Sequence, residues 1–267
     1  MGGTGWAWAQ GGARLALAVV ISAAVTGAAA PARGAGGPGA ASAQRQLQAW
    51  MRREGLLRRI VRPPAGVLPY RYLIPGAHYY QLFDWDTYFM GVALSYQHRG
   101  QALADSVRDF LHFTGRDAAY PGYTPREIAP QGFWALPEMC KPFLAQMALR
   151  ASLTLHSAAW LRPDWGRLRA TLAYWRQARQ APDGLFTWFD GVESGVDNSP
   201  AVSSTPANRT EGVDLACYLV REDRAMAALA TMLGQPAEAQ AYAARARHLT
   251  RLVQTRLWSA KDGTFYD

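Results

Sequence analysis

The chain has 267 residues, of which 49% are hydrophobic and 12% aromatic, and its formal net charge is +8 at pH 7. This is enough apolar material for a sizeable core in one domain or two. The arginines are scattered along helical segments, which argues against the basic patch of a nucleic-acid-binding protein, and no zinc-ligand spacing is present. The ten tryptophans, twelve tyrosines and nine phenylalanines fit either a large aromatic core or a cleft whose ring faces stack on a sugar.

The first 43 residues have the pattern of a targeting segment. Arg14 precedes an uncharged apolar run that begins at Leu15, and small residues at 41–43 offer a cleavage site. Cleavage after Ala30 is the alternative, which would leave 31–43 as a flexible leader. The run is short for a bilayer-spanning helix. We therefore expect an exported protein, periplasmic or extracellular, whose mature chain has no membrane span and forms a domain over 44–267.

From Gln44 onward the apolar residues recur at helical spacing, three and four positions apart. This periodicity predicts about seven helices. Their apolar stripes lie at Leu47–Leu57, Phe89–Tyr96, Leu103–Leu111, Pro142–Leu155, Trp165–Trp175, Glu211–Leu233 and Pro236–Leu257.

The connections between these helices are of two kinds. Gly234 and Pro236 are a helix stop followed by a helix start, which predicts an antiparallel hairpin. Long loops rich in glycine, proline and aromatic residues cover 62–85, 115–141 and 181–210. No stretch alternates as a strand does, so the predicted architecture is all-α, with helical hairpins whose long loops gather at one end.

The first loop ends in a tryptophan between two acids, Asp84-Trp85-Asp86. Either an aspartate caps the following helix while the rings pack in the core, or Trp85 is a platform for a sugar ring and Asp86 accepts its hydroxyl groups. In the second loop Arg126 and Glu127 form either a loop ion pair or a ligand contact.

The third loop places three acids and two glycines between aromatic residues, over 188–200. Cleavage of a glycosidic bond needs a carboxylic acid that is protonated, and a second group that activates water. A carboxyl group walled in by aromatic rings is desolvated, which favours its neutral form. Asp197 is the predicted acid; an ordinary turn with side-chain capping is the alternative.

These segments resemble glycoside hydrolase family 63 and, more distantly, the trehalases of family 37. The resemblance runs from Tyr79 to Asp267. It rests on Trp85-Asp86, on Glu-Ser-Gly-Val-Asp-Asn-Ser-Pro at 193–200, on Val213-Asp214-Leu215, and on the final Gly-Thr-Phe-Tyr-Asp. It implies an (α/α)6 toroid, an inverting mechanism, a carbohydrate substrate and no catalytic metal or other cofactor.

The resemblance also implies residue roles. Asp197 falls on the proton donor, Trp85 and Asp86 fall on the subsite of the released sugar, and Glu193 and Asn198 help to shape that pocket. Arg126 and Trp188 are further candidates for substrate contact.

Two departures from the trehalases narrow the expected substrate. The chain has Glu-Met-Cys-Lys-Pro at 138–142 where trehalases carry an Arg-Ser-Gln-Pro-Pro segment, and it lacks their arginine clamps around 78–81. These differences favour the family 63 side, and therefore an α-glucoside or α-mannoside.

The length departs from the family as well. A closed toroid needs about a dozen helices, so the chain corresponds to its first half, and no glutamate after Asp197 fits the general base. We expect a fragment of a longer enzyme, with a truncated paralogue as the alternative.

Three functions are compatible with these residues. The first is an inverting exo-acting glycosidase, inactive as this fragment. The second is a non-catalytic sugar-binding protein on the same fold. The third is a polysaccharide lyase, which would need a Tyr/His pair such as His78 with Tyr79 or Tyr80. Cys140 and Cys217 form either one disulfide or two buried free thiols, and the sequence specifies no oligomeric state.

Overall fold

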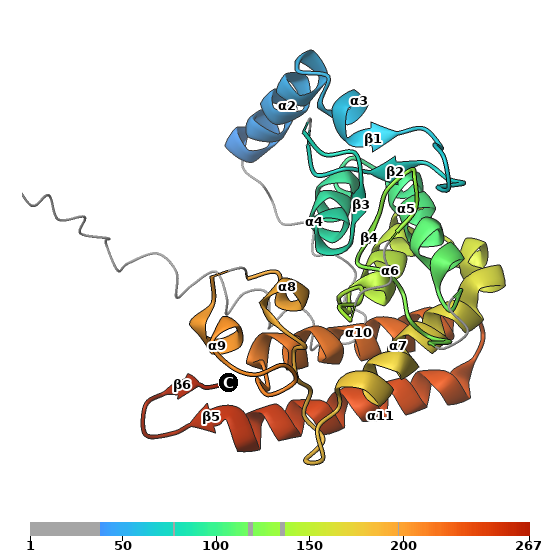
Figure 1. The fold of residues 1–267 in the computed structure, drawn as a ribbon. Coiled ribbons are helices and arrows are strands. Elements are labelled where there is room, and N and C mark those ends of the chain that lie inside the picture. Colours follow the sequence, from blue (N-terminus) through green and yellow to red (C-terminus); the bar gives the residue numbers. More distant parts are fainter. Residues whose placement is uncertain (1–37, 77, 117–119, 134–136, 197) are drawn as a thin grey trace, which may run out of the picture. The chain divides into compact units, whose positions relative to one another are not determined.

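The computed structural model describes residues 38–267 except 77, 117–119, 134–136 and 197 (Figure 1). The contacts divide the chain into two units, Met1–Glu54 and Gly55–Asp267. In the first unit, helix α2 covers Pro38–Arg53, so it begins within the expected leader. The apolar run of the predicted targeting segment lies outside the described residues. Among the described helices, none has the length and apolar character needed to cross a bilayer.

The second unit is built mainly from helices. Together with α2, six helices of this unit have eleven or more residues and account for the seven that the periodicity predicts. They are α4 (Asp84–Ser95), α5 (Gly100–Phe113), α6 (Leu144–Thr154), α7 (Trp165–Arg179), α10 (Val213–Met232) and α11 (Pro236–Leu252). Shorter turns are α3 (Leu56–Ile60), α8 (Gly191–Ser194), α9 (Pro200–Ser203), a 3-10 turn (Ala159–Asp164) and a π turn (Val253–Leu257).

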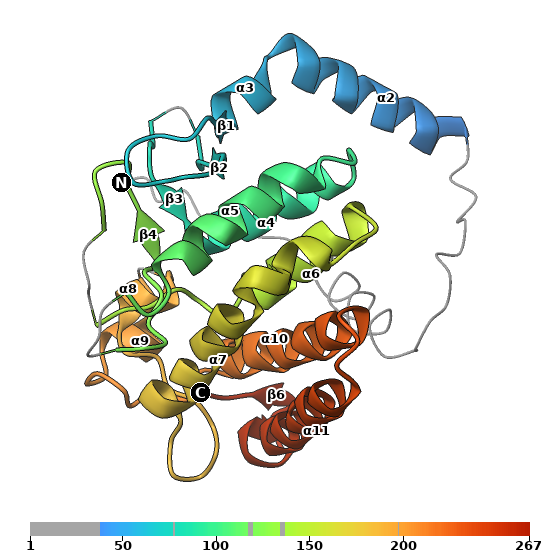
Figure 2. The same ribbon diagram turned by 90° about the vertical axis from the view of Figure 1, so that its right-hand side faces the viewer.

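The long helices of this unit pack side by side. Helix α6 contacts α4 and α5 on one side and α10 on the other, and α10 packs along α11 (Figure 2). The α10–α11 hairpin turns at Gly234, whose φ of +77° suits a glycine, and Pro236 opens α11. The predicted hairpin and the predicted all-α class are confirmed.

Among the described residues there are three antiparallel pairs of two-residue strands, of which the β3–β4 pair joins segments more than 40 positions apart. They are β1 (Val61–Arg62) with β2 (Tyr72–Leu73), β3 (Leu82–Phe83) with β4 (Glu127–Ile128), and β5 (Trp258–Ser259) with β6 (Thr264–Phe265). The expectation that no strand is present is therefore wrong in detail. A strand of two residues is too short to show alternation.

The core follows the predicted stripes except in α4 and in α2, where Leu47 and Trp50 are 55% and 45% exposed. Leu103, Val107 and Phe110 of α5 are fully buried, as predicted, but Phe89 of α4 is 60% exposed. The α4 face that is buried runs instead through Gly91, where an added Cβ would lie 2.5 Å from the Leu103 Cδ1 atom. Close packing of α5 against this glycine sets the orientation of α4.

The two cysteines are free thiols. Cys140 is buried and Cys217 is exposed, so neither expected alternative, a disulfide or two buried thiols, holds in full.

Asp109 of α5 carries a carboxyl group with no exposed surface. Its Oδ1 atom accepts a hydrogen bond from the Tyr70 N–H group (3.1 Å), while Oδ2 has no partner. Burial, together with the charge of Asp105, raises the pKa of Asp109 to about 8. This carboxyl group is therefore protonated at neutral pH in the folded protein.

We expect Asp109→Asn to remove a loss of stability at alkaline pH. The unfolded chain ionises this group near pH 4 and the folded chain near pH 8, so the wild type loses stability as the pH rises between the two values. Denaturant unfolding should give similar free energies near pH 4, below which neither state ionises the group. The variant should be more stable at pH 9 by on the order of a few kcal/mol, with about half of that difference already present at pH 6. Asp262→Asn, on the exposed β5–β6 turn, is the control. If the free energy of unfolding depends on pH in the same way for wild type and Asp109→Asn, the pKa of Asp109 is not raised in the folded protein.

Candidate active site

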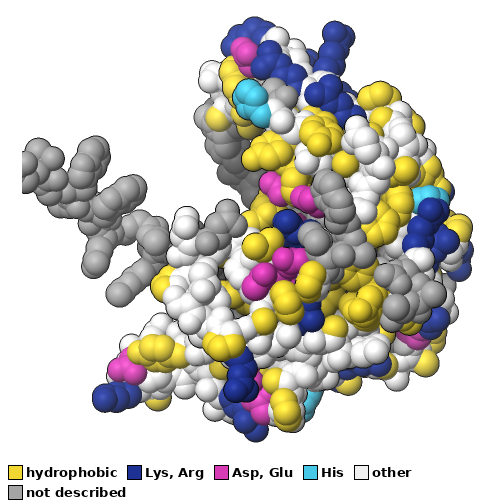
Figure 3. All heavy atoms as spheres, in the orientation of Figure 1, with side chains coloured by type: hydrophobic (Ala, Val, Ile, Leu, Met, Phe, Trp, Pro, Cys, Tyr) yellow, Lys and Arg dark blue, Asp and Glu magenta, His cyan; other side chains and the backbone are white. Residues whose placement is uncertain are grey.

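The Asp84-Trp85-Asp86 segment lies where β3 meets α4. Because Phe83 pairs with Glu127, Asp84 lies beside Arg126, and its N–H group donates to the Arg126 carbonyl oxygen at 3.1 Å. On the face shown in Figure 3, acidic and basic side chains gather among hydrophobic ones over the region of α4, β4 and α8.

Asp84 is a buried anchor. Its side chain and that of Lys141 are 3% and 2% exposed, and the Lys141 Nζ atom lies 3.5 Å from Oδ1. The Asp84 carboxylate also accepts hydrogen bonds from the N–H groups of Lys141 (2.8 Å) and Trp85 (2.7 Å). With these partners a buried charge is compensated, and the first turn of α4 is tied to the segment around Lys141.

Glu193 forms a second buried ion pair, with Arg179 of α7. Its Oε1 atom lies 2.8 Å from the Arg179 Nη2 atom, and the two side chains are 0% and 8% exposed. The same carboxylate accepts from the N–H groups of Phe189 (2.7 Å) and Met139 (3.2 Å). Burial raises the pKa of Glu193, and Arg179 opposes that rise. The family resemblance implies that Glu193 helps to shape the sugar pocket. Its side chain has no exposed surface and holds the loop in place.

Residues 139–141, here called the strut, connect the two ion pairs. Met139 donates to Glu193 and Lys141 donates to Asp84. Between them Cys140 donates to the Thr124 carbonyl at 2.9 Å, and the Trp175 indole N–H donates to the Cys140 carbonyl at 3.0 Å. The strut therefore fixes the start of α4 relative to the 188–196 loop.

Trp85 is covered along one edge by the 188–196 loop. An added Cβ at Gly195, whose φ is +74°, would lie 2.7 Å from the Trp85 Cζ2 atom and 2.9 Å from the Lys141 Cε atom. The Lys141 ammonium lies 4.9 Å from the centroid of the same indole, within reach of a cation–π interaction. Glycine is thus required at 195 both by its backbone angle and by its contact with Trp85.

We expect Gly195→Ala to be more disruptive than Gly234→Ala. Both glycines have φ near +75°, but nothing lies within 4 Å of a Cβ added at Gly234. The backbone strain of about 1–2 kcal/mol is therefore common to both variants, whereas overpacking against Trp85 adds about 1–3 kcal/mol at position 195 alone. Urea unfolding measures this difference, and equal losses would mean that the loop does not rest on Trp85.

Asp86 is the partly exposed acid next to Trp85. Burial, with the charge of Asp84 adding to it, raises the pKa of Asp86. Its environment therefore makes the charged form of the carboxyl group less favourable than it is in water.

Trp188 lies in the core of this region. It is 1% exposed, its ring is 6.0 Å from that of Trp175 in an edge-on arrangement, and its indole N–H donates to Asp214 Oδ1 at 3.0 Å. No ring face is open to a sugar, contrary to the expectation for Trp188. Asp214 lies at the start of α10, in the Val213-Asp214-Leu215 segment that carried part of the resemblance without giving Asp214 a role. Burial raises the pKa of Asp214, and its hydrogen bond ties Trp188 to α10.

The remaining candidates differ in what can be described. Arg126 is partly exposed, and among the described residues its Nε atom is buried without a hydrogen-bond partner. Asn198 is exposed. Asp197 lies outside the described residues. Within the part of the chain that is described, no group of three His, Cys, Asp or Glu residues could hold a metal ion.

Three of the solved structures that are similar to this chain match it to different extents. A family 63 mannosylglycerate hydrolase from Thermus thermophilus, in complex with glucose, is 16% identical with a TM-score of 0.50, over 76% of this chain and 64% of that chain. An uncharacterised conserved protein from the same organism is 18% identical with a TM-score of 0.49, over 77% and 64%. A sialidase matches 45% of this chain and 11% of its own, at 20% identity and a TM-score of 0.41.

This chain thus spans less than two thirds of the length of each of these proteins. The likeness to the mannosylglycerate hydrolase confirms the predicted all-α toroid class. No curated protein sequence matches the chain significantly.

The model of the mannosylglycerate hydrolase MGH1-like glycoside hydrolase domain matches residues 79–267. This range contains Trp85, the strut and the 188–196 loop, and it coincides with the predicted resemblance to family 63, which is confirmed. The chain therefore belongs to the family of MGH1-like glycoside hydrolase domains.

Proposed function

We propose that this chain is part of an exo-acting, inverting glycosidase that hydrolyses a small α-glycoside. The observation that carries the proposal is the contact of Gly195 with the Trp85 indole. It brings the loop that leads to Asp197 against an aromatic ring that is partly exposed, and a sugar ring needs such an apolar face beside hydrogen-bonding groups.

In this proposal Asp197, two residues beyond Gly195, is the general acid. It donates its proton to the oxygen of the leaving group as the glycosidic bond breaks. Glu193 and Arg179 hold the loop, while Asp86 and the guanidinium of Arg126 bind hydroxyl groups of the sugar. Exposed Asn198 is a further hydroxyl partner.

The substrate and the general base belong to the same proposal. The mannosylglycerate hydrolase of similar fold favours an α-mannoside or α-glucoside. We place the general base in a segment outside these 267 residues, because the alignment with that enzyme covers 64% of its chain. The proposal includes export of the protein, directed by the targeting segment predicted in the first 43 residues.

The anomeric configuration of the first product tests the mechanism. The protein, including any segment that follows residue 267, is incubated with α-mannosides and α-glucosides while proton NMR follows the reducing sugar. The β-anomer is expected to appear before mutarotation. Appearance of the α-anomer first would reject the mechanism, because inversion needs two carboxyl groups about 6.5–9.5 Å apart with water between them.

The same experiment separates the two alternative functions. A non-catalytic protein would bind the sugar and leave it intact. A polysaccharide lyase would release an unsaturated product that absorbs in the ultraviolet, and with a monosaccharide glycoside it would release nothing.

A further inference from the structure

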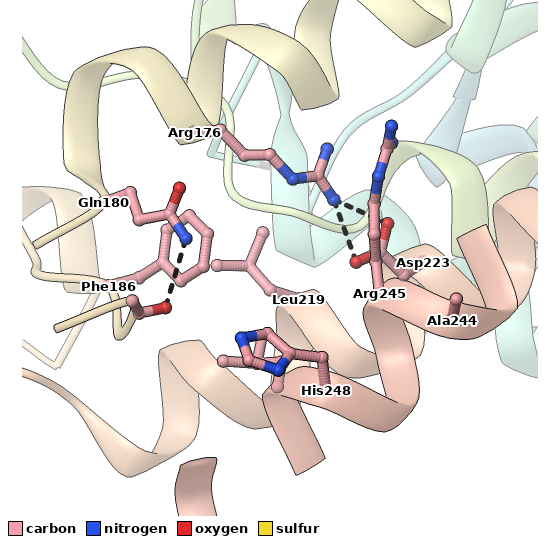
Figure 4. Close-up of a pocket in the computed structure, with 10 residues that line it drawn as sticks. Arg176, Gln180, Phe186, Leu219, Asp223, Ala244, Arg245 and His248 are labelled. Atoms are coloured by element: carbon pink, nitrogen blue, oxygen red, sulfur yellow. Dashed lines mark hydrogen bonds and ion pairs between the residues drawn. The ribbon is translucent and has the colours of Figure 1, made fainter. Parts of the chain in front are cut away.

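A groove between α7 and α11 lies apart from the Trp85 site. A cavity of about 300 Å³ is bounded by α7, the turn at 180–186, α10 and α11 (Figure 4). A second hollow of about 380 Å³ lies further along α7 beside Gly166, Ala170 and Ala173. Arg176 and Arg245 line both, so these two side chains lie between the two hollows. Small residues on α7 leave the space open.

The groove has an excess of positive charge. Arg176 donates to both carboxylate oxygens of Asp223 through a single nitrogen, Nη2, at 2.7 and 2.9 Å. Its Nε and Nη1 donors make no hydrogen bond to any described residue. Arg245 forms no ion pair within the described part of the chain, and its guanidinium carbon lies 5.0 Å from the Tyr242 ring. Two arginines against one aspartate leave a net charge of +1, with His248 also at the rim.

The rest of the wall is apolar. Phe186, Leu219 and Leu249 are 4%, 1% and 5% exposed and form the floor, and Figure 4 shows Phe186 on the opposite side of Leu219 from Arg176. A ligand that fits would carry an anionic group at the arginine end and an apolar or ring-shaped body over Leu219. Arginine binds carboxylates and phosphates with paired donors, which a lysine does not offer.

We propose that this groove binds a small organic anion, with its carboxylate or phosphate held by Arg176 and Arg245 and its body resting on Phe186 and Leu219. The site shares no residue with the Trp85 region and is independent of the glycosidase proposal. Asp223 holds Arg176 in position, and Arg245 supplies the cation that lacks a carboxylate partner.

Titration calorimetry on the full chain tests this proposal with three probes. Benzoate carries a carboxylate on a ring, inorganic phosphate carries charge without a body, and benzyl alcohol carries the ring without charge. We expect saturable binding of benzoate that benzyl alcohol does not reproduce. Binding of phosphate alone would assign the groove to phosphorylated ligands, whereas binding of benzoate alone would assign it to carboxylates.

Variants at exposed positions keep the fold intact. Arg245→Gln should weaken the binding of the anion by about tenfold or more, and Ala244→Glu, which places a carboxylate on the groove wall, should abolish it. Arg247→Gln, on the same helix but not lining the groove, should leave it unchanged. The proposal is overturned if no anion binds saturably, if benzyl alcohol binds as well as benzoate, or if Arg245→Gln and Arg247→Gln have equal effects.

Discussion

Asp197→Asn is expected to lower kcat for an α-glycoside with a poor leaving group by about 10²–10⁴-fold, because the amide cannot donate the proton that the departing oxygen needs. The decrease in kcat is measured as the turnover of a methyl or glyceryl glycoside by the full enzyme. If Asp197 acts only as the proton donor, the stability of the variant should equal that of the wild type within about 0.5 kcal/mol.

A glycosyl fluoride provides the matched control for Asp197→Asn. Fluoride leaves without protonation, so loss of a general acid should affect this substrate far less than the glyceryl glycoside. Equal losses on both substrates would mean that Asp197 acts through the structure of the loop and not as a proton donor.

Arg179→Met is expected to destabilise the fold by about 3–5 kcal/mol, because it leaves the Glu193 carboxylate buried without its cation. The pair is almost wholly shielded from water, with side-chain exposures of 8% and 0%. Denaturant unfolding at neutral pH measures the loss. Arg169→Met removes a comparable 2.7 Å ion pair with Glu238 whose side chains are 48% and 30% exposed. That control should cost about 0–1 kcal/mol.

Two further outcomes bear on Arg179. The double variant Arg179→Met/Glu193→Gln should recover part of the lost stability, since it no longer buries an unpaired charge. If Arg179→Met and Arg169→Met cost the same, the buried pair does not hold the 188–196 loop.

The long helices could be predicted because their apolar stripes persist for several turns. Leu103, Val107 and Phe110 are buried as their spacing requires, and Gly234 and Pro236 mark the α10–α11 turn. The face of α4 could not be predicted in this way. Its contact with α5 runs through Gly91, and a glycine adds nothing to an apolar stripe.

The candidate site was only partly visible in the sequence. The Trp-Asp pair and the Glu-Ser-Gly segment pointed to one region, and Gly195 does contact Trp85. The residues that hold this region in place could not be predicted from the sequence. Lys141 is 57 positions from Asp84, and no local pattern distinguishes this acid from others of the chain. For the same reason Glu193 and Trp188, polar or aromatic residues of a glycine-containing loop, resembled ligand contacts although both are buried.

The strut also bears on how the chain reaches its native state. Its hydrogen bonds from Lys141 to Asp84 and from Met139 to Glu193 close loops of 57 and 54 residues. The entropy of each closure is lost before the contact is gained, which slows the formation of non-local structure. A chain whose hairpins have formed but not yet docked would therefore have most of its helical content while Trp85 and Gly195 remain apart.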